Sequence, residues 1–308
     1  MSEHRFDHDR YRVKPGESPD LDDRSTRADV KGFEKEDALA ALEEDRRRLA
    51  EDQRVLYADG RRALLIVFQA LDAAGKDGTI RHVMSGVNPQ GCSVTGFKAP
   101  TAEEAAHHFL WRPARHLPRK GHIAIFNRSY YEETLVVRVH PEWLAGQQLP
   151  PEVLDPEWLT PKGLADGGPP KSFWRRRFEA INGFEETLHE AGTRVLKFYL
   201  HVSKDEQRER FLERIDRPEK NWKFSSADIR ERGYWDDYRH AYEQTLKHTS
   251  TKHAPWHVIP ADQKWFMRSL VGDIISSTLE EMDLAYPVLP PDEAARLQDA
   301  KRQLLAEG

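Results

Sequence analysis

The sequence predicts an α/β fold in which a five-stranded, mostly parallel sheet is covered by helices on both faces. Three observations predict it. Five short apolar runs recur along the chain, stretches with helical spacing separate them, and the strongest run is apolar at every position from Leu64 to Phe68. A strand without a polar face is typical of burial between two layers. Strands that alternate with helices indicate a parallel sheet.

The composition excludes several classes of protein. The 308 residues are 32% charged and carry a formal net charge of -5, with 47 Lys and Arg residues. A basic site must therefore come from local clustering. The single cysteine, Cys92, excludes an internal disulfide framework and a cysteine-based zinc site. Because no apolar run reaches membrane-spanning length and the charged N-terminus does not resemble a signal peptide, we expect a cytoplasmic protein without a membrane partner.

The chain divides into an arm at 1–34, one domain at 35–285 and a tail at 286–308. The arm is charged and turn-rich, so we expect it to lie over the domain or to be partly disordered. The leucines between Lys35 and Tyr57 fall near helical spacing, which predicts an amphipathic helix that Gly60 ends.

The later elements follow from local signals. Thr101 and Glu104 form a capping box that starts a helix, and Gly192 is a typical helix stop. Frequent proline and glycine predict an insertion loop at 141–172. We expect strands at 92–97, 121–126, 195–202 and 256–260, and helices at 101–111, 173–191, 204–215, 226–247 and 262–282.

The stretch after the first strand has the features of a phosphate-binding loop. Residues 70–78 turn the chain and open a helix at Thr79, and a helix N-terminus offers N–H groups and a positive dipole end to an anion. The match to G-x-x-x-x-G-K-[ST], the Walker A pattern, is partial. Gly75 and Lys76 fit it, whereas Ala70 replaces the first glycine and Asp77 replaces the hydroxyl residue.

Asp72 indicates a metal ion in this loop. Phosphates repel a carboxylate unless a cation lies between them, so Asp72 predicts Mg²⁺, with Mn²⁺ as a substitute. The alternative is an ordinary turn aspartate whose side chain binds nearby backbone N–H groups.

Further polar residues follow the second and third strands, and strand ends of a parallel sheet meet at one edge. Lys98 follows the second strand, and Asn127 and Arg128 follow the third. Asn127 stands where a P-loop enzyme places its Walker B aspartate, and its amide oxygen can hold metal-bound water. Because an amide carries no charge, Glu132 and Glu133 are the natural substitutes for the metal-binding carboxylate. Arg128 is either a clamp on transferred phosphoryl groups or a surface arginine.

A basic segment covers residues 208–223. Its acidic residues favour a solvated helix with ion pairs, whereas Trp222 and Phe224 favour a flap that closes over phosphates and excludes water. The aromatic residues that follow at helical spacing are expected in the core: Tyr234, Trp235, Tyr238 and Tyr242. The cations of the segment are Arg210, Arg214, Arg217, Lys220 and Lys223.

Several motifs in the same order resemble the polyphosphate kinase 2 family, and its class III in particular. They are FQALDAAGKDGTIRHV, NPQG, FKAPTAEE with FLWR, FNRSYYEE, NWKF and APWHVIPADQKWF, within the similarity from about Tyr11 to about Met282. The resemblance implies a three-layer P-loop kinase fold related to thymidylate kinase, with a helical lid at about 208–232. It also implies Mg²⁺-dependent phosphoryl transfer between polyphosphate and AMP, ADP or ATP.

The resemblance also implies roles for individual residues. Asp72 would hold Mg²⁺, Lys76 would bind phosphate and Arg128 would clamp the transferred group. Asn127 and Glu132 mark the class III variant, and Glu133 stands where an aspartate is expected. Lys98 and Arg112 resemble the residues on the nucleotide side, and Arg217, Lys220 and Lys223 resemble those of the lid. The other residues expected to bind substrate are Ala73, Ala74, Gly75, Asp77, Gly78, Thr79 and Arg214.

Three functions stay open at this point. The first is a polyphosphate:nucleotide phosphotransferase that acts on adenine nucleotides, with guanine nucleotides as further candidates, and that assembles as a homodimer or homotetramer. The second is an ATP-dependent nucleoside monophosphate kinase. The third is a non-catalytic binder of polyphosphate or RNA, although we expect no nucleic-acid partner for an enzyme of the first kind.

Overall fold

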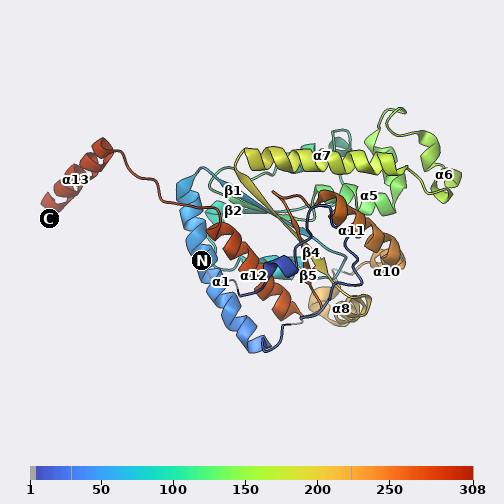
Figure 1. Cartoon of the computed structure of the whole chain (residues 1–308), viewed down its shortest axis with the longest axis horizontal. Coiled ribbons are helices and arrows are strands. Elements are labelled where there is room, and N and C mark those ends of the chain that lie inside the picture. The colour runs from blue at the N-terminus through green and yellow to red at the C-terminus, as the bar shows by residue number, and fades with distance from the viewer. Residues whose placement is uncertain (1–4, 29, 223, 308) are drawn as a thin grey trace.

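A computed structural model provides the structure, which describes residues 5–28, 30–222 and 224–307. Five strands form one sheet in the order β2-β3-β1-β4-β5, and every neighbouring pair is parallel. The α/β fold expected from the sequence is confirmed, and all five strands occur where they were predicted (Figure 1). The strands are β1 Ala63–Gln69, β2 Cys92–Gly96, β3 Ile123–Asn127, β4 Thr193–His201 and β5 Trp256–Pro260.

Strand β1 is the centre of the sheet and is buried along its whole length. Leu65 lies opposite Ala124 of β3 and Val195 of β4. This explains the uninterrupted apolar run, because a central strand between two helical layers has no wet face.

Helices cover both faces of the sheet (Figure 1). On one side α1 (Lys35–Asp59) packs along α12 (Lys264–Glu280), and α12 also contacts α2 (Lys76–Val83) and β5. On the other side α7 (Lys171–Glu190) packs on β4 and on α11 (Trp235–Thr249). Gly60 ends α1 in a left-handed conformation, with φ 64°, as expected.

Two predicted helices are wrong in part. The helix expected at 101–111 is two short helices, α3 (Ala102–Ala105) and α4 (Trp111–Ala114), although the capping box of Thr101 is present. The helix expected at 226–247 is divided at Tyr234 into α10 (Ser226–Gly233) and α11. In addition, α2 begins at Lys76 and not at Thr79.

The region expected as a loop at 141–172 is not free of secondary structure. It contains the short helices η4 (Pro141–Gln147), η5 (Pro156–Leu159) and α6 (Pro161–Ala165). The other elements are η1 (His8–Arg10), η2 (Pro89–Gly91), η3 (Tyr130–Glu133), α5 (Val136–Val139), α8 (Lys204–Asp216), α9 (Pro218–Asn221) and α13 (Pro291–Ala306).

The two terminal segments behave differently. The described part of the N-terminal arm lies along β5, where the Val13 N–H donates to the Trp256 carbonyl and the Val258 N–H donates to the Tyr11 carbonyl, both at 2.8 Å. Phe6 is buried in the core. At the other end, α13 projects away from the body of the molecule (Figure 1). None of the helices in the described ranges is long and apolar enough to cross a membrane.

Candidate active site

The loop between β1 and α2 has an unusual backbone. Ala73 has φ 61° and Gly75 has φ 110°, both in the left-handed region. A Cβ atom on Gly75 would lie 3.2 Å from Cε of Met267. Position 75 therefore favours glycine for its backbone conformation and for space.

Lys76 begins α2 and folds back over this loop. Its Nζ donates to the carbonyls of Ala70 at 2.8 Å and Leu71 at 3.3 Å. Burial, followed by the nearby Arg128 guanidinium, lowers the pKa of Lys76 to about 8. The ammonium group is still mostly charged at pH 7 and lies where it can bind a phosphate oxygen.

Arg128 connects the ends of two neighbouring strands. It follows β3 with φ 64°, and its backbone N–H donates to the Phe68 carbonyl on β1 at 3.0 Å. Its Nη2 donates to Asp72 Oδ1 at 2.6 Å and its Nη1 to Glu132 Oε2 at 3.3 Å. The negative charge of Glu132 is the main reason why the pKa of Arg128 is raised. The structure thus brings together three residues that the sequence singled out.

Glu132 lies between two pockets. Asp72, Arg128 and Glu132 line the first, together with side chains of α8, α10 and α11. Glu132 also lines the second, together with Phe97 and Arg112. The arginine and carboxylates at the sheet edge can therefore face two ligands that approach from different sides.

The other two polar residues at this edge are paired with each other. Asn127 Nδ2 donates to Asp77 Oδ1 at 2.7 Å. The described residues contain no group of three or more His, Cys, Asp or Glu side chains that could bind a metal ion by themselves. This fits Mg²⁺, which proteins usually hold through one or two carboxylates together with substrate phosphates and water. Asp72 and Asp77 are the two carboxylates of this loop.

The Glu133 carboxylate is bound by side chains of η4 and α7. Its Oε2 accepts hydrogen bonds from Gln147 Nε2 at 2.7 Å and Arg177 Nη1 at 3.1 Å. Burial raises the pKa of Glu133. Because Arg177 and Gln147 already bind this carboxylate, we leave Glu133 out of the metal ligands that the sequence suggested.

The second pocket contains one of the two cations expected on the nucleotide side. The guanidinium of Arg112 lies 5.1 Å from the centre of the Phe97 ring and donates to the Lys98 carbonyl at 2.8 Å. Lys98 contributes its backbone to this contact, and the residue is exposed. Phe109 also lines this pocket, and the guanidinium of Arg177 lies 4.5 Å from the centre of its ring.

The predicted lid contains the ion pairs that a solvated helix would have, which was the alternative to a flap that closes over phosphates. Arg214 lies 3.5 Å from Asp228, and Glu213 accepts from Lys220 at 2.6 Å and from Arg217 at 3.0 Å. Lys223 lies outside the described residues. The lid cations are therefore neutralised within the lid in this structure.

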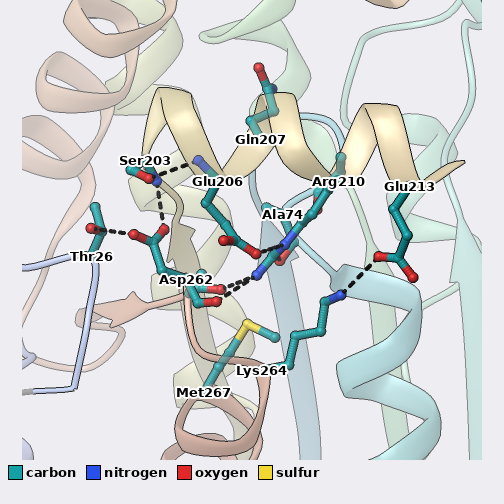
Figure 2. Close-up of polar contacts among 12 residues, drawn as sticks. Thr26, Ala74, Ser203, Glu206, Gln207, Arg210, Glu213, Asp262, Lys264 and Met267 are labelled. Atoms are coloured by element: carbon teal, nitrogen blue, oxygen red, sulfur yellow. Dashed lines mark hydrogen bonds and ion pairs between the residues drawn. The ribbon is translucent and has the colours of Figure 1, made fainter.

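Sequence reasoning missed how α8 supports the phosphate loop (Figure 2). Arg210 is buried, and its Nη1 donates to the carbonyls of Ala73 at 3.1 Å and Ala74 at 2.7 Å. Its Nη2 donates to the carbonyls of Ala261 and Asp262 after β5. Nε binds Glu206 at 2.8 Å, so all five N–H donors are used.

Gln207 on the same helix extends this support. Its Nε2 donates to the Asp72 carbonyl at 3.0 Å. Two side chains of α8 thus hold three successive carbonyls of the loop, Asp72 to Ala74. By sequence, Arg210 groups with the lid cations. Its spacing of three residues from Gln207 was the only sequence signal that both side chains lie on the same face of α8.

Three aromatic residues assigned to the core also line the first pocket. Trp235, Tyr238 and Tyr242 are buried, and they line the pocket together with Asp72 and Arg128. Tyr234 is an exception to the prediction, because 42% of it is exposed. Periodicity predicted their burial but not that their helix forms a pocket wall.

A buried network lies under η3, which directly follows Arg128. The hydroxyls of Tyr130 and Tyr131 both donate to Glu185 Oε1 at 2.7 Å, and Lys197 Nζ donates to Glu185 Oε2 at 2.6 Å. Lys197 and Glu185 are fully buried. Because η3 also contains Glu132, this network fixes the segment that carries the site.

The parallel sheet with its flanking helices and the glycine–lysine turn after β1 define a P-loop kinase fold. The profile of the polyphosphate kinase 2 family matches residues 32–148 and 169–287. The chain belongs to this family. The unmatched residues 149–168 fall within the predicted insertion.

Individual relatives agree with this assignment. An ADP-polyphosphate phosphotransferase of Rhodopseudomonas palustris is 49% identical over 295 residues, which cover 96% of this chain and 97% of that protein. An AMP/ADP-polyphosphate phosphotransferase of Meiothermus ruber is 45% identical over 280 residues, covering 90% and 95%. The crystal structure of polyphosphate kinase 2 from Arthrobacter aurescens has a TM-score of 0.80 and 38% identity, covering 97% and 95% of the two chains.

Proposed function

We propose that this protein transfers the terminal phosphoryl group of inorganic polyphosphate to AMP and ADP, with Mg²⁺ or Mn²⁺ as cofactor. One observation carries the proposal: Arg128 binds Asp72 in one pocket and Glu132 at the boundary with a second. Phosphoryl transfer requires the attacking and leaving oxygens to lie roughly in line. Two pockets that share Glu132, the partner of Arg128, can hold donor and acceptor in this way.

The chain's own residues supply positioning and charge neutralisation. The bond between the terminal phosphorus and its bridging oxygen breaks, and that oxygen leaves with the shortened polymer. A bond forms between the phosphorus and a phosphate oxygen of the nucleotide. Lys76 and the N–H groups at the start of α2 bind the oxygens of the moving group, and Arg128 neutralises the charge that they share.

Asp72 and Asp77 would hold the cofactor, with Asn127 orienting Asp77 through its 2.7 Å hydrogen bond. Mg²⁺, when bound, neutralises phosphate charge and aligns the phosphate oxygens. Glu132 is another candidate ligand, and it keeps Arg128 oriented toward Asp72.

The second pocket would bind the acceptor nucleotide. Phe97 and Phe109 offer aromatic faces, and Arg112 places a cation beside Phe97. Stacking accepts either purine because every base has a π face. We therefore infer that adenine and guanine nucleotides both enter, with ATP bound in the reverse reaction.

The lid cations would close over the polymer. Arg214, Arg217 and Lys220 would exchange their carboxylate partners for phosphates, and this exchange would exclude water from the transfer. We also infer a cytoplasmic location and a homodimer or homotetramer, which light scattering on the purified protein would test.

One experiment separates the three functions left open by the sequence. The purified protein is incubated with AMP and Mg²⁺, and with either polyphosphate or ATP as donor. The proposal predicts ADP and ATP from polyphosphate. An ATP-dependent monophosphate kinase would form ADP only when ATP is the donor, and a non-catalytic binder would retain polyphosphate without forming either product.

A further inference from the structure

The N-terminal arm contacts one aspartate that directly follows β5. Beyond its pairing with β5 the arm buries Leu21, whose carbonyl lies 3.1 Å from Nε2 of His201 at the end of β4. The arm then reaches Asp262. The Asp262 backbone N–H donates to the Thr26 carbonyl at 2.9 Å, and Asp262 Oδ2 accepts from the Thr26 hydroxyl at 2.8 Å. These two hydrogen bonds join the arm to the carboxyl edge of the sheet.

The other carboxylate oxygen of Asp262 holds the N-terminus of α8. Oδ1 accepts from the Ser203 backbone N–H at 2.8 Å, and the Ser203 hydroxyl accepts from the Glu206 N–H at 3.1 Å and caps the helix. The first N–H groups of a helix lack partners within the helix, so a carboxylate is favourable there both as an acceptor and as a negative charge. Asp262 therefore connects the arm with the start of α8.

The same helix holds the phosphate loop about two turns later. Arg210 of α8 donates to the Asp262 carbonyl at 3.1 Å and to the loop carbonyls of Ala73 and Ala74. Figure 2 shows this continuous path of contacts, from Thr26 through Asp262 and Arg210 to Ala74. Because Asp262 binds both the N-terminus of α8 and the guanidinium that holds the loop, a displacement of Asp262 would move the loop as well.

The arm does not depend on the Thr26 hydroxyl for its attachment. Tyr11, Val13 and Leu21 are buried, and backbone hydrogen bonds join the first two to β5. Thr26 and Asp262 are only half-buried, so water can reach the carboxylate when the hydroxyl is removed. Loss of this hydroxyl should therefore change the geometry around Asp262 while the arm stays folded on the domain.

We propose that Asp262 is a positioning residue for phosphoryl transfer and that Thr26 of the N-terminal arm keeps it in place. The inference rests on the proposed function. Transfer requires the loop to hold the phosphate oxygens in one geometry, and small displacements of positioning groups have large effects on rate. The arm thus contributes to turnover although none of its described residues lines either pocket of the site.

The first test removes the Thr26 hydroxyl. Thr26→Val keeps the shape of the side chain but cannot donate to Asp262, whereas Thr26→Ser keeps the donor. With polyphosphate, AMP and Mg²⁺, Thr26→Val should lower kcat between about 2- and 30-fold, the range that changes along such contact networks produce. KM for AMP should stay unchanged, because Thr26 lies outside the second pocket. Thr26→Ser should restore kcat. Ser25→Ala removes the neighbouring exposed hydroxyl, which binds Arg27 within the arm, and is the matched control.

A double-mutant cycle tests whether the effect passes through α8. Thr26→Val combined with Arg210→Lys should lose less kcat than the product of the two single losses, because both changes release the same loop. Asp262→Ala, which loses both side-chain contacts, should lower kcat more than Thr26→Val does. Amide hydrogen exchange of residues 70–78, measured without substrate, should be faster in Thr26→Val than in Thr26→Ser. This measurement does not depend on turnover.

Several results would overturn the proposal. If Thr26→Val had the kcat and the loop exchange of the unaltered protein, the arm would have no part in positioning. If Thr26→Ser lost as much activity as Thr26→Val, or if the losses of Thr26→Val and Arg210→Lys simply multiplied, the hydroxyl would not act through Asp262 and Arg210. A fall in kcat that matches the loss of folded protein, measured by circular dichroism, would make the contact merely structural. Loss of turnover in the unaltered protein would instead refute the proposed function, and the exchange measurement would still test the arm.

Discussion

The guanidinium of Arg128 donates a 2.6 Å hydrogen bond to the carboxylate of Asp72, although the two residues are 56 positions apart in the sequence. The two residues meet because β1 and β3 are parallel neighbours whose carboxyl ends lie at the same edge. This pair connects the phosphate loop with the second pocket through Glu132. The account of the site depends on it.

Arg128→Lys should lower kcat about 10³-fold, because an arginine that neutralises transition-state charge contributes at least that much in related reactions. A lysine keeps the charge but cannot bind Asp72 and Glu132 with one planar fork. Steady-state kinetics with saturating polyphosphate would measure the loss. Arg119→Lys, at an exposed position, should leave kcat unchanged. Equal activity in both variants would remove Arg128 from the mechanism.

The pKa of Lys76 predicts a pH dependence. This pKa is lowered to about 8 from 10.5, so the ammonium group of the free enzyme loses its proton as pH rises through about 8. The value of kcat/KM for polyphosphate should fall above that pH, since kcat/KM reports the free enzyme. In Lys76→Arg, the pH profile of the remaining activity should lack this fall above about pH 8. A profile that stays flat up to the ordinary lysine pKa would contradict the assignment.

The same shift affects stability with the opposite sign. Between about pH 8 and 10.5 the unfolded chain binds more protons at Lys76 than the folded chain does. The contribution of this group to the free energy of unfolding should therefore increase with pH across that window. Urea unfolding of the protein and of Lys76→Met at both ends of the window would isolate this contribution.

Arg210→Lys should weaken the support of the phosphate loop. Lysine has three donors, so it cannot satisfy the five acceptors that Arg210 now binds. We expect kcat to fall between about ten- and hundredfold, because small displacements of positioning groups have effects of this size. Arg208→Lys on the exposed face of α8 is the control. If both variants keep full activity, the contacts of Arg210 with Ala73 and Ala74 do not position the loop.

The buried pair of Lys197 and Glu185 predicts a large stability effect. Lys197→Met leaves the Glu185 carboxylate buried without its cation, which typically lowers the free energy of unfolding by about 3–5 kcal/mol. The exposed pair of Arg175 and Glu179 on α7 gives the comparison, where Arg175→Ala should cost less than about 1 kcal/mol. Urea denaturation followed by circular dichroism would measure both. If both variants lost a similar free energy of unfolding, the expectation that breaking the buried pair costs more than breaking the exposed pair would be wrong.

The sheet could be predicted from the sequence because each strand is marked by its own short apolar run. The apolar runs at β1, β3 and β5 mark burial directly, and parallel order follows from the helices between them. The convergence of Asp72, Lys76 and Arg128 followed from the same rule about strand ends. These residues could be predicted because their position depends on topology and not on side-chain detail.

Long-range side-chain contacts could not be predicted. The helix expected at 101–111 is interrupted, and Phe109 turns toward Arg177 of α7. The helix expected at 226–247 is divided at Tyr234, and Glu231 then reaches both His140 and Tyr238. Glu133 was assigned to a metal by proximity in sequence, but Arg177 lies 44 residues later and binds it. No local pattern encodes such partners.

The most direct measurement is the rate at which Asp72→Asn converts AMP to ADP and ATP with polyphosphate and Mg²⁺. The account predicts no detectable product from this variant, with circular dichroism and thermal unfolding close to those of the unaltered protein. EDTA should stop the unaltered protein in the same assay. A folded Asp72→Asn protein that forms ADP at the normal rate would contradict the account.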